Sequence, residues 1–249
     1  MRILVTFAVE AEFAPWRKLH DFRKTTTGDV DRFSTRFSGA ELNVFLTGIA
    51  GKSGWLEAAT ALYDSEIDLC ISSGLAGGLR PEHKIGEILV AEKVLAAELD
   101  LSAFSEPSLV ESAIATGAKR ALFYTANHVV LTAAEKRKLG AFADAVEMES
   151  CGVLVEAGLF AAKTVAIRAI SDTSEEDLPL DFNRVTNDSG DVSLTRVLGE
   201  VVSAPGSIPA LVRFGQRSRF AAQSLANFLE RYLQALVAER RSPSVVPVQ

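Results

Sequence analysis

The sequence predicts an α/β protein with a largely parallel sheet and helices on both of its faces. Near-continuous Val, Ile and Leu runs of strand length, such as residues 67–72 and 85–94, alternate with segments of helical periodicity. A strand that is apolar at nearly every position must be covered on both faces. The 249 residues contain no internal repeat or low-complexity linker, which predicts a single domain over 1–241 and a frayed tail over 242–249.

Composition and charge restrict the kind of partner. The 26 Lys and Arg against 32 Asp and Glu leave a net charge of −6 without a long block of one sign, which argues against a nucleic-acid surface. No segment approaches the ~20 apolar residues of a membrane span, and the N-terminus lacks the features of a signal peptide. Cys70 and Cys151 each lie in an apolar run and are expected to be buried free thiols, which fits the cytoplasm.

In the first half of the chain, the carboxyl ends of the predicted strands carry the informative residues. Glu10 and Glu12 follow the first strand at alternate positions and are expected on one face; alternatively, both are solvated and open a helix. The glycine-rich segment 74–78 is expected as a loop that either approaches a ligand closely or simply makes a tight turn. The predicted strands are 2–8, 42–47, 67–72 and 85–94, and the predicted helices are 54–63 and 108–116.

The second half predicts more helix. Thr132 with Glu135 three residues later forms a capping-box pattern, which predicts the start of a helix. Residues 173–190 are acidic and rich in turn residues, which indicates a long loop that is a plausible lid. The predicted strands are 122–125, 128–131 and 163–171, and the predicted helices are 132–139, 150–160, 192–202, 209–214 and 219–240.

Two segments place charged residues at the ends of buried elements. They are Ala145-Val146-Glu147-Met148-Glu149-Ser150 and Arg168-Ala169-Ile170-Ser171-Asp172. Burying a charge is costly unless it is paired or bound. A single carboxylate here would suit a structural ion pair with Arg168. Glu149 and Asp172, together with Glu12, suit glycosidic chemistry, in which one acid protonates a leaving group and another orients sugar hydroxyls.

These segments resemble the purine nucleoside phosphorylase and nucleosidase superfamily over residues 1–181. The motifs are most similar to those of methylthioadenosine/S-adenosylhomocysteine nucleosidases, whereas residues 193–236 resemble the extension of hopanoid-associated phosphorylases. The resemblance is carried, in family order, by residues 3–12, 47–79, 146–150 and 168–172.

The resemblance implies a three-layer αβα sandwich around a mixed, partly closed sheet, assembled as a homodimer or larger homo-oligomer. It also implies cleavage of the N-glycosidic bond of a purine-type nucleoside, which is the expected small-molecule partner. No metal or organic cofactor is implied; inorganic phosphate would be a co-substrate if the protein were a phosphorylase.

Carried over by position, the resemblance assigns roles to individual residues. Asp172 would protonate or hydrogen-bond the departing base, and burial beside Ile170 would favour the proton that it needs near neutral pH. Glu149 would bind ribose hydroxyls with Met148 packed under the sugar, and Glu12 and Arg168 would hold the attacking water. Further substrate contacts are assigned to Gly77, Val130 (through its backbone), Glu147 and Ser171. Leu101, Phe104 and Leu178 are candidates for the 5′ pocket, with plain packing as the alternative.

Two departures from the family pattern bear on the reaction. Leu75 stands where many relatives have Ser or Thr, and there is no Gly-Asp-Pro turn of the kind that grips phosphate in phosphorylases. Glu10 and Glu12 would repel a phosphate dianion, which favours hydrolysis. The alternatives are a phosphorylase for the same substrates, because hopanoid-associated relatives share the acidic turn, and a non-catalytic nucleoside-binding protein.

Overall fold

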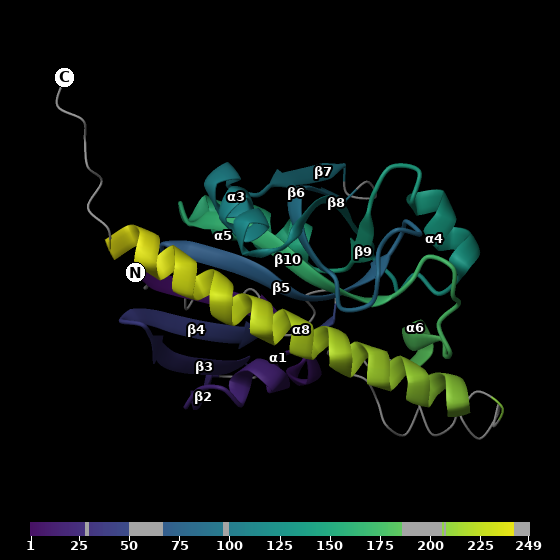
Figure 1. Cartoon of the computed structure of the whole chain (residues 1–249), viewed down its shortest axis with the longest axis horizontal. Coiled ribbons are helices and arrows are strands. Elements are labelled where there is room, and N and C mark those ends of the chain that lie inside the picture. The colour runs from purple at the N-terminus through teal and green to yellow at the C-terminus, as the bar shows by residue number, and fades with distance from the viewer. Residues whose placement is uncertain (28–29, 50–66, 97–99, 186–205, 207, 242–249) are drawn as a thin grey trace.

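The computed structural model describes residues 1–27, 30–49, 67–96, 100–185, 206 and 208–241. In this part of the chain, ten strands form one mixed, partly closed sheet with helices on both faces (Figure 1). The predicted α/β architecture is therefore confirmed. The predicted helices over 54–63 and 192–202 and the tail over 242–249 lie outside the described residues.

One half of the sheet closes into a ring of five strands. These are β5 (Leu69–Gly78), β9 (Ala145–Glu147), β8 (Lys119–Thr125), β6 (Ile88–Ala96) and β10 (Lys163–Asp172). β10 runs parallel to β5 on one side and antiparallel to β6 on the other, which closes the ring. β7 (Leu101–Phe104) pairs with β6 outside the ring. Ring closure brings the C-terminal ends of β5 and β10 next to β9.

The other half of the sheet is an open wing. Its strands are β1 (Arg2–Phe7), β4 (Ala40–Leu46), β3 (Val30–Phe37) and β2 (Arg23–Thr27). β1 lies between β5 and β4 and is parallel to both, so the predicted strands over 2–8 and 42–47 are confirmed. The β2–β3 hairpin was not predicted. Arg23–Thr27 contains no apolar residue, and only backbone pairing with β3 defines it as a strand.

Two predictions about the loops are wrong. Glycine-rich residues 74–78 are not a loop but the end of β5, because their backbone pairs with β10 and, at Gly77 and Gly78, with β9. Residues 128–131 are not a strand; this segment is irregular and leads into α4 (Ala133–Leu139). The predicted cap of α4 is confirmed, because the Thr132 hydroxyl accepts a hydrogen bond from the Glu135 amide at 3.2 Å.

Helices cover both faces of the sheet (Figure 1). α1 (Glu10–Arg17), α3 (Pro107–Thr116) and the long α8 (Ile208–Arg241) pack together on one face, and α5 (Ser150–Leu159) packs on the other. The short α6 (Phe182–Val185) lies near the N-terminal half of α8 (Figure 1). Two separate helices were predicted over 209–214 and 219–240, but α8 runs through Gly215 without a break.

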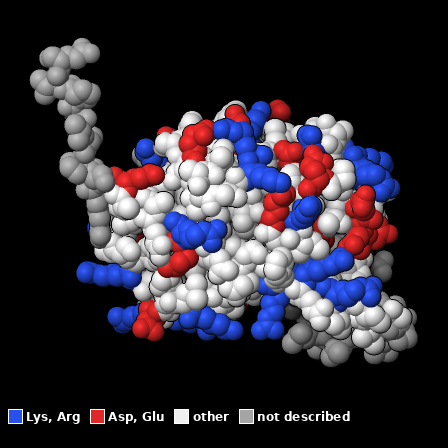
Figure 2. Space-filling model, in the orientation of Figure 1, with Lys and Arg blue, Asp and Glu red and all other residues white. Residues whose placement is uncertain are grey.

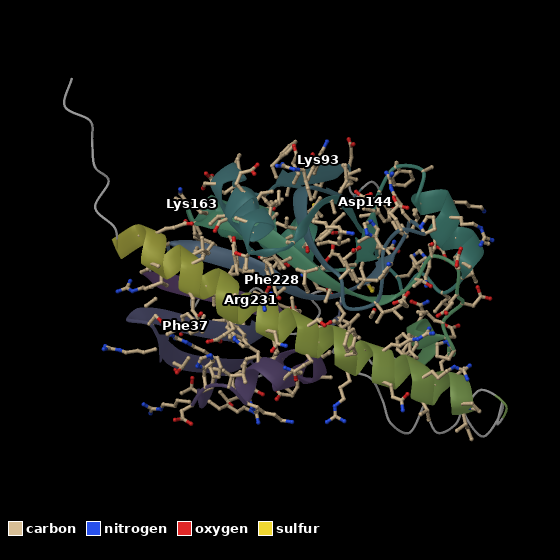
Figure 3. All side chains as sticks on the ribbon, in the orientation of Figure 1. Phe37, Lys93, Asp144, Lys163, Phe228 and Arg231 are labelled. Atoms are coloured by element: carbon tan, nitrogen blue, oxygen red, sulfur yellow. The ribbon has the colours of Figure 1, made fainter. Side chains whose placement is uncertain are left out.

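The core lies mainly beneath α8. Its largest cluster joins side chains of β1, β5, β10, α1, α3 and α8, with Trp16 and Tyr232 fully buried. Along α8, Phe228 is buried and Arg231 is exposed (Figure 3), which is the pattern of an amphipathic helix that covers a sheet. Cys70 and Cys151 are buried free thiols, as predicted.

The visible surface carries interspersed positive and negative side chains rather than one strong patch (Figure 2). None of the described helices combines the length and the apolar composition that crossing a bilayer requires.

Candidate active site

A cavity of about 590 Å³ opens where the C-terminal ends of β1, β5, β9 and β10 meet. This is the edge at which parallel sheets usually bind ligands. The side chains and backbone that line it come from these strand ends, α1, the segment before α4, and α8. The lining includes seven predicted site residues besides Glu12, namely Gly77, Val130, Glu147, Met148, Glu149, Ser171 and Asp172.

Glu12 lies in the first turn of α1, and its carboxylate is held by backbone groups. It accepts hydrogen bonds from the amides of Ala8 at 3.1 Å and Leu75 at 2.9 Å. Burial raises the pKa of Glu12, and this effect outweighs the hydrogen bond from Leu75 and the charge of Arg168, which act in the opposite direction. A carboxylate with a raised pKa is a better proton acceptor near neutral pH.

Glu10 does not share this environment. Because the chain is helical from Glu10 onward, positions 10 and 12 point in different directions. Glu10 instead forms a half-exposed ion pair with Arg17 at 2.7 Å. The expectation that both carboxylates face one side is wrong, and the alternative, a solvated residue that opens a helix, describes Glu10 alone.

Arg168 is the central cation of the site and is 1% exposed. Its Nη2 contacts Glu147 at 2.6 Å and Glu149 at 3.6 Å, and it donates to the Ser72 hydroxyl at 3.3 Å. Its Nε has no hydrogen-bond partner among the described residues. Arg168 is not among the residues that line the cavity, but it contacts Glu147 and Glu149, which are.

Glu147 is held by structural contacts. One of its oxygens accepts hydrogen bonds from Arg168 and from the amides of Glu149 at 3.0 Å and Ser150 at 2.7 Å, and the other accepts from the Thr125 hydroxyl. Glu147 therefore places negative charge at the N-terminus of α5, where this charge interacts favourably with the helix dipole. These four donors leave Glu147 little capacity to bind a sugar.

Met148 and Glu149 line the cavity directly after Glu147. Glu149 is the N-cap residue of α5, and its side chain is 11% exposed. Its carboxylate shares the Arg168 guanidinium with Glu147, so one cation neutralises two neighbouring acids. The thioether side chain of Met148 lies between these two acids in the sequence and supplies an apolar surface to the cavity.

Asp172 ends β10 and has a partner on each oxygen. The Ser171 hydroxyl is 2.7 Å from Oδ1, and the ammonium of Lys136 is 2.5 Å from Oδ2. The Ser171 hydroxyl also lies 3.2 Å from the Ala76 carbonyl, so its single proton has two possible acceptors. The sequence offered Arg168 as the ion-pair partner of a carboxylate here, but in the structure the cation on Asp172 is Lys136.

Lys136 is the site residue that the sequence analysis missed. It lies on α4 among Glu135, Arg137 and Lys138, a run that normally marks a solvated helix face. The available signal was its spacing of three residues from both Ala133 and Leu139, which places it on the apolar side of α4.

Two glycines of β5 make room for the two carboxylates. A Cβ atom at Gly74 would lie 3.0 Å from Oε2 of Glu12, and one at Gly77 would lie 3.0 Å from Oδ2 of Asp172. Gly74 also has a φ of +150°, which side chains disfavour. The glycine-rich end of β5 is therefore explained by close approach of these acids.

The segment around Val130 forms another wall. Asn183 of α6 occupies both backbone groups of Val129, with its side-chain amide accepting from the Val129 N–H at 2.7 Å and donating to the carbonyl at 3.0 Å. In the described part of the chain the backbone N–H and carbonyl of Val130 have no such partner, and Val130 lines the cavity.

The lining from α6, α8 and the segment before α6 includes three large apolar side chains, Leu178, Phe182 and Phe214, together with Ser218 and Arg219. The rings of Phe182 and Phe214 lie 5.3 Å apart. Of the three predicted 5′-pocket residues, only Leu178 lines the cavity of this chain. Leu101 and Phe104 lie on β7, exposed by 46% and 64%.

The comparisons with known proteins agree with this geometry. The model of the phosphorylase superfamily matches residues 2–202. The aminodeoxyfutalosine nucleosidase of Campylobacter jejuni is 23% identical over 222 residues, which are 80% of this chain and 97% of that protein.

Two solved structures share the fold. The 5′-methylthioadenosine/S-adenosylhomocysteine nucleosidase of Campylobacter jejuni has a TM-score of 0.71 at 18% identity, covering 94% of this chain and 99% of its own. The futalosine hydrolase of Helicobacter pylori has a TM-score of 0.71 at 20% identity, and the match covers 96% of this chain and 98% of that one. Because the family match spans most of the chain and includes β1, β5, β9 and β10, which carry the site, this protein belongs to the phosphorylase superfamily.

Proposed function

We propose that this protein hydrolyses the N-glycosidic bond of a purine-type nucleoside that carries an apolar substituent at its 5′ end. The observation that carries the proposal is the environment of Glu12. Its carboxylate is oriented by two backbone amides, has a raised pKa, and lies in the cavity wall within the field of Arg168. This is the arrangement expected of a general base for a water molecule.

In this proposal Glu12 takes a proton from the water that attacks the anomeric carbon of the sugar. The Nε of Arg168, a buried donor without a partner among the described residues, would hold the oxygen of that water. A buried donor that lacks a partner costs free energy, so a bound oxygen at this position is favourable. Glu12 and Arg168 thus keep the roles that the resemblance implies.

The remaining carboxylates match the charges that develop as the bond breaks. Positive charge grows on the sugar, and we assign Glu149 to the ribose hydroxyls with Met148 packed against the ring. Negative charge grows on the base, and we assign its relief to Asp172 with Ser171. The backbone groups of Val130 are proposed to read the edge of the base. We propose Glu147 as a support for Arg168 and α5, because its oxygens are already occupied.

The charge of the cavity favours water over phosphate as the nucleophile. In the described part of the chain, four carboxylates line the cavity, from Glu12, Glu147, Glu149 and Asp172, and the one Lys or Arg side chain in the lining is Arg219. Bringing a phosphate dianion next to these acids would cost electrostatic free energy at the low effective dielectric of a cavity. Leu75 adds an apolar side chain where a hydroxyl would otherwise contact the phosphate.

The apolar side chains of Leu178, Phe182 and Phe214 support the 5′ substituent. The relatives are named for nucleosides that are modified at this position, and we extend that substrate class to this protein. The proposed reaction needs no metal and no organic cofactor. A homodimer or larger homo-oligomer and a cytoplasmic location complete the proposal.

The test is release of free base from adenosine, inosine, 5′-methylthioadenosine, S-adenosylhomocysteine and aminodeoxyfutalosine, with and without millimolar phosphate. Equal rates with free sugar as the product would support hydrolysis, and the 5′-modified nucleosides should have the higher kcat/KM. Release only with phosphate, with a sugar 1-phosphate as the product, would make the protein a phosphorylase. Tight nucleoside binding without any release would make it a non-catalytic binding protein.

A further inference from the structure

The ammonium of Lys136 is fully enclosed and fully hydrogen-bonded. Its side chain is 0% exposed, and its Nζ contacts Oδ2 of Asp172 at 2.5 Å and the carbonyls of Thr173 and Glu176 at 3.0 Å each. An ammonium has three N–H donors, and each one has an acceptor here. Lys136 is not among the residues that line the cavity, so it reaches Asp172 from behind the cavity wall.

Stability alone is a weak reason for this arrangement. Taking a lysine and a carboxylate out of water is costly, and apolar residues of similar size often serve a core at least as well. The Lys136 charge is directed at one particular carboxylate, and that carboxylate lines the cavity. A function for Asp172 explains why the charge is placed there.

We propose that Lys136 is a positioning residue for glycosidic cleavage: it holds Oδ2 of Asp172, so that a proton carried on Oδ1 passes to the departing base and the carboxylate that is left stays paired with Lys136. This inference rests on the proposed function. The partners of Oδ1 are consistent with it, because Ser171 can turn its proton to the Ala76 carbonyl and leave Oδ1 free to carry one. Oδ2 has no such freedom, since an ammonium only donates.

Lys136 also ties Asp172 to the segment that follows it. The carbonyls of Thr173 and Glu176 bind the same ammonium, and the Asp177 carboxylate accepts a hydrogen bond from the Ala133 amide at 2.7 Å. The N-terminal part of α4 thereby fixes the start of the segment that leads to Leu178 in the cavity. Loss of Lys136 should shift the carboxylate of Asp172 locally. The packing of the core cluster beneath α8 should not change.

The test compares Lys136→Met with Lys138→Met, which removes an exposed lysine from the same helix. Two substrates are used: the nucleoside of the panel with the highest wild-type kcat/KM, and 4-nitrophenyl riboside, whose leaving group departs without a proton. For the purine nucleoside, kcat should fall about 100-fold in Lys136→Met, the usual effect of misplacing a reacting group by about 1 Å, while KM changes little. Cleavage of the nitrophenyl riboside should stay within about threefold of wild type, since this step does not use the proton of Asp172.

A second measurement separates positioning from general damage to the fold. In an Asp172→Asn background, Lys136→Met should cause no further loss on the purine nucleoside, because the two residues act as one unit. Lys136→Arg, which keeps the charge, should recover part of kcat. Thermal melts of all variants identify any that fails to fold, and the arginine variant then carries the test.

Each outcome decides between the two hypotheses. Equal losses on both substrates, or an additional loss in the Asp172→Asn background, would overturn the positioning role while leaving hydrolysis intact. A wild-type protein that cleaves no nucleoside of the panel would overturn the proposed function, and the inference with it.

Discussion

Glu12 and Asp172 are two acids in the wall of one cavity, but they are held by different kinds of partner. Glu12 accepts hydrogen bonds from two backbone amides, and its carboxylate forms no ion pair within 4 Å among the described residues. Asp172 has a buried ammonium on one oxygen and a hydroxyl on the other. Both acids end next to β5, opposite Gly74 and Gly77 respectively.

The surroundings of each carboxylate, rather than its residue type, therefore set its affinity for a proton and its orientation. Around Glu12, burial without a close cation raises the pKa, which suits a group that must take up a proton. Around Asp172, Lys136 binds one oxygen and fixes the orientation of the side chain, which suits a group that must meet a defined atom of the base. Four predictions test this difference between the two acids.

The largest effect is expected from Glu12→Gln. The amide keeps the size of the side chain but cannot accept the proton of the attacking water, so kcat for hydrolysis should fall by ~10²–10⁴-fold. Steady-state base release measures this loss. Glu10→Gln is the matched control, because Glu10 is half-exposed and paired with Arg17, and it should keep the wild-type rate. Full activity of Glu12→Gln would remove Glu12 as the base.

Asp172→Asn should lower both stability and activity, whereas Glu12→Gln should lower activity alone. Removing one partner of a buried ion pair leaves Lys136 enclosed without its counter-charge, and we expect the free energy of unfolding to fall by about 3 kcal/mol. Urea denaturation at neutral pH measures the difference. If both variants were equally stable, the contrast between the two environments would be wrong.

Gly77→Ala tests the close approach of β5 to Asp172. The new Cβ would lie 3.0 Å from Oδ2 and 3.3 Å from Cγ1 of Val146, so either Asp172 or the strand must shift. We expect a loss of about 1–3 kcal/mol in stability from overpacking and about a tenfold lower kcat, or about 1.4 kcal/mol of barrier. Gly152→Ala on α5 meets nothing within 4 Å and is the control, which should be as stable as wild type or slightly more so.

The smallest effect concerns pH. Because folding raises the pKa of Glu12 above its ordinary value of 4.5, the native state binds this proton more tightly than the unfolded chain does. The resulting stabilisation is complete below the unfolded pKa and is lost as the pH rises through the folded pKa. The Tm of Glu12→Gln should therefore rise relative to that of wild type as the pH goes from acid to neutral, which thermal melts across this pH range measure.

The same shift predicts the acid side of the activity profile. Glu12 must be ionised to act as the base, so kcat should fall as the pH drops through the raised pKa. A gain in Tm that is independent of pH, or activity that persists in acid, would contradict the raised pKa.

Some parts of the fold could be predicted from the sequence because the patterns that indicate them involve only neighbouring residues. The apolar runs of β1 and β10 and the Thr132 cap of α4 depend on neighbouring residues, and all three were predicted. The β2–β3 hairpin was not, because β2 contains no apolar residue and the buried residues of β3, Phe33 and Phe37, are four positions apart rather than part of an apolar run. The break predicted between residues 214 and 219 is absent, since α8 continues through Gly215; the cost of a glycine inside a helix is offset by packing along the rest of α8.

From the sequence alone, Glu12, Glu149 and Asp172 could be placed at the ends of buried elements, where burying a charge is costly unless it is paired or bound. The partner that each of these acids has in the cavity depends on the tertiary structure. Lys136 and Asp172 are 36 residues apart, and their 2.5 Å contact depends on how α4 packs behind the end of β10. The sequence specifies which ionisable side chains are present. Burial and long-range pairing specify the protonation and the orientation of these side chains, and both depend on how the elements around the cavity pack.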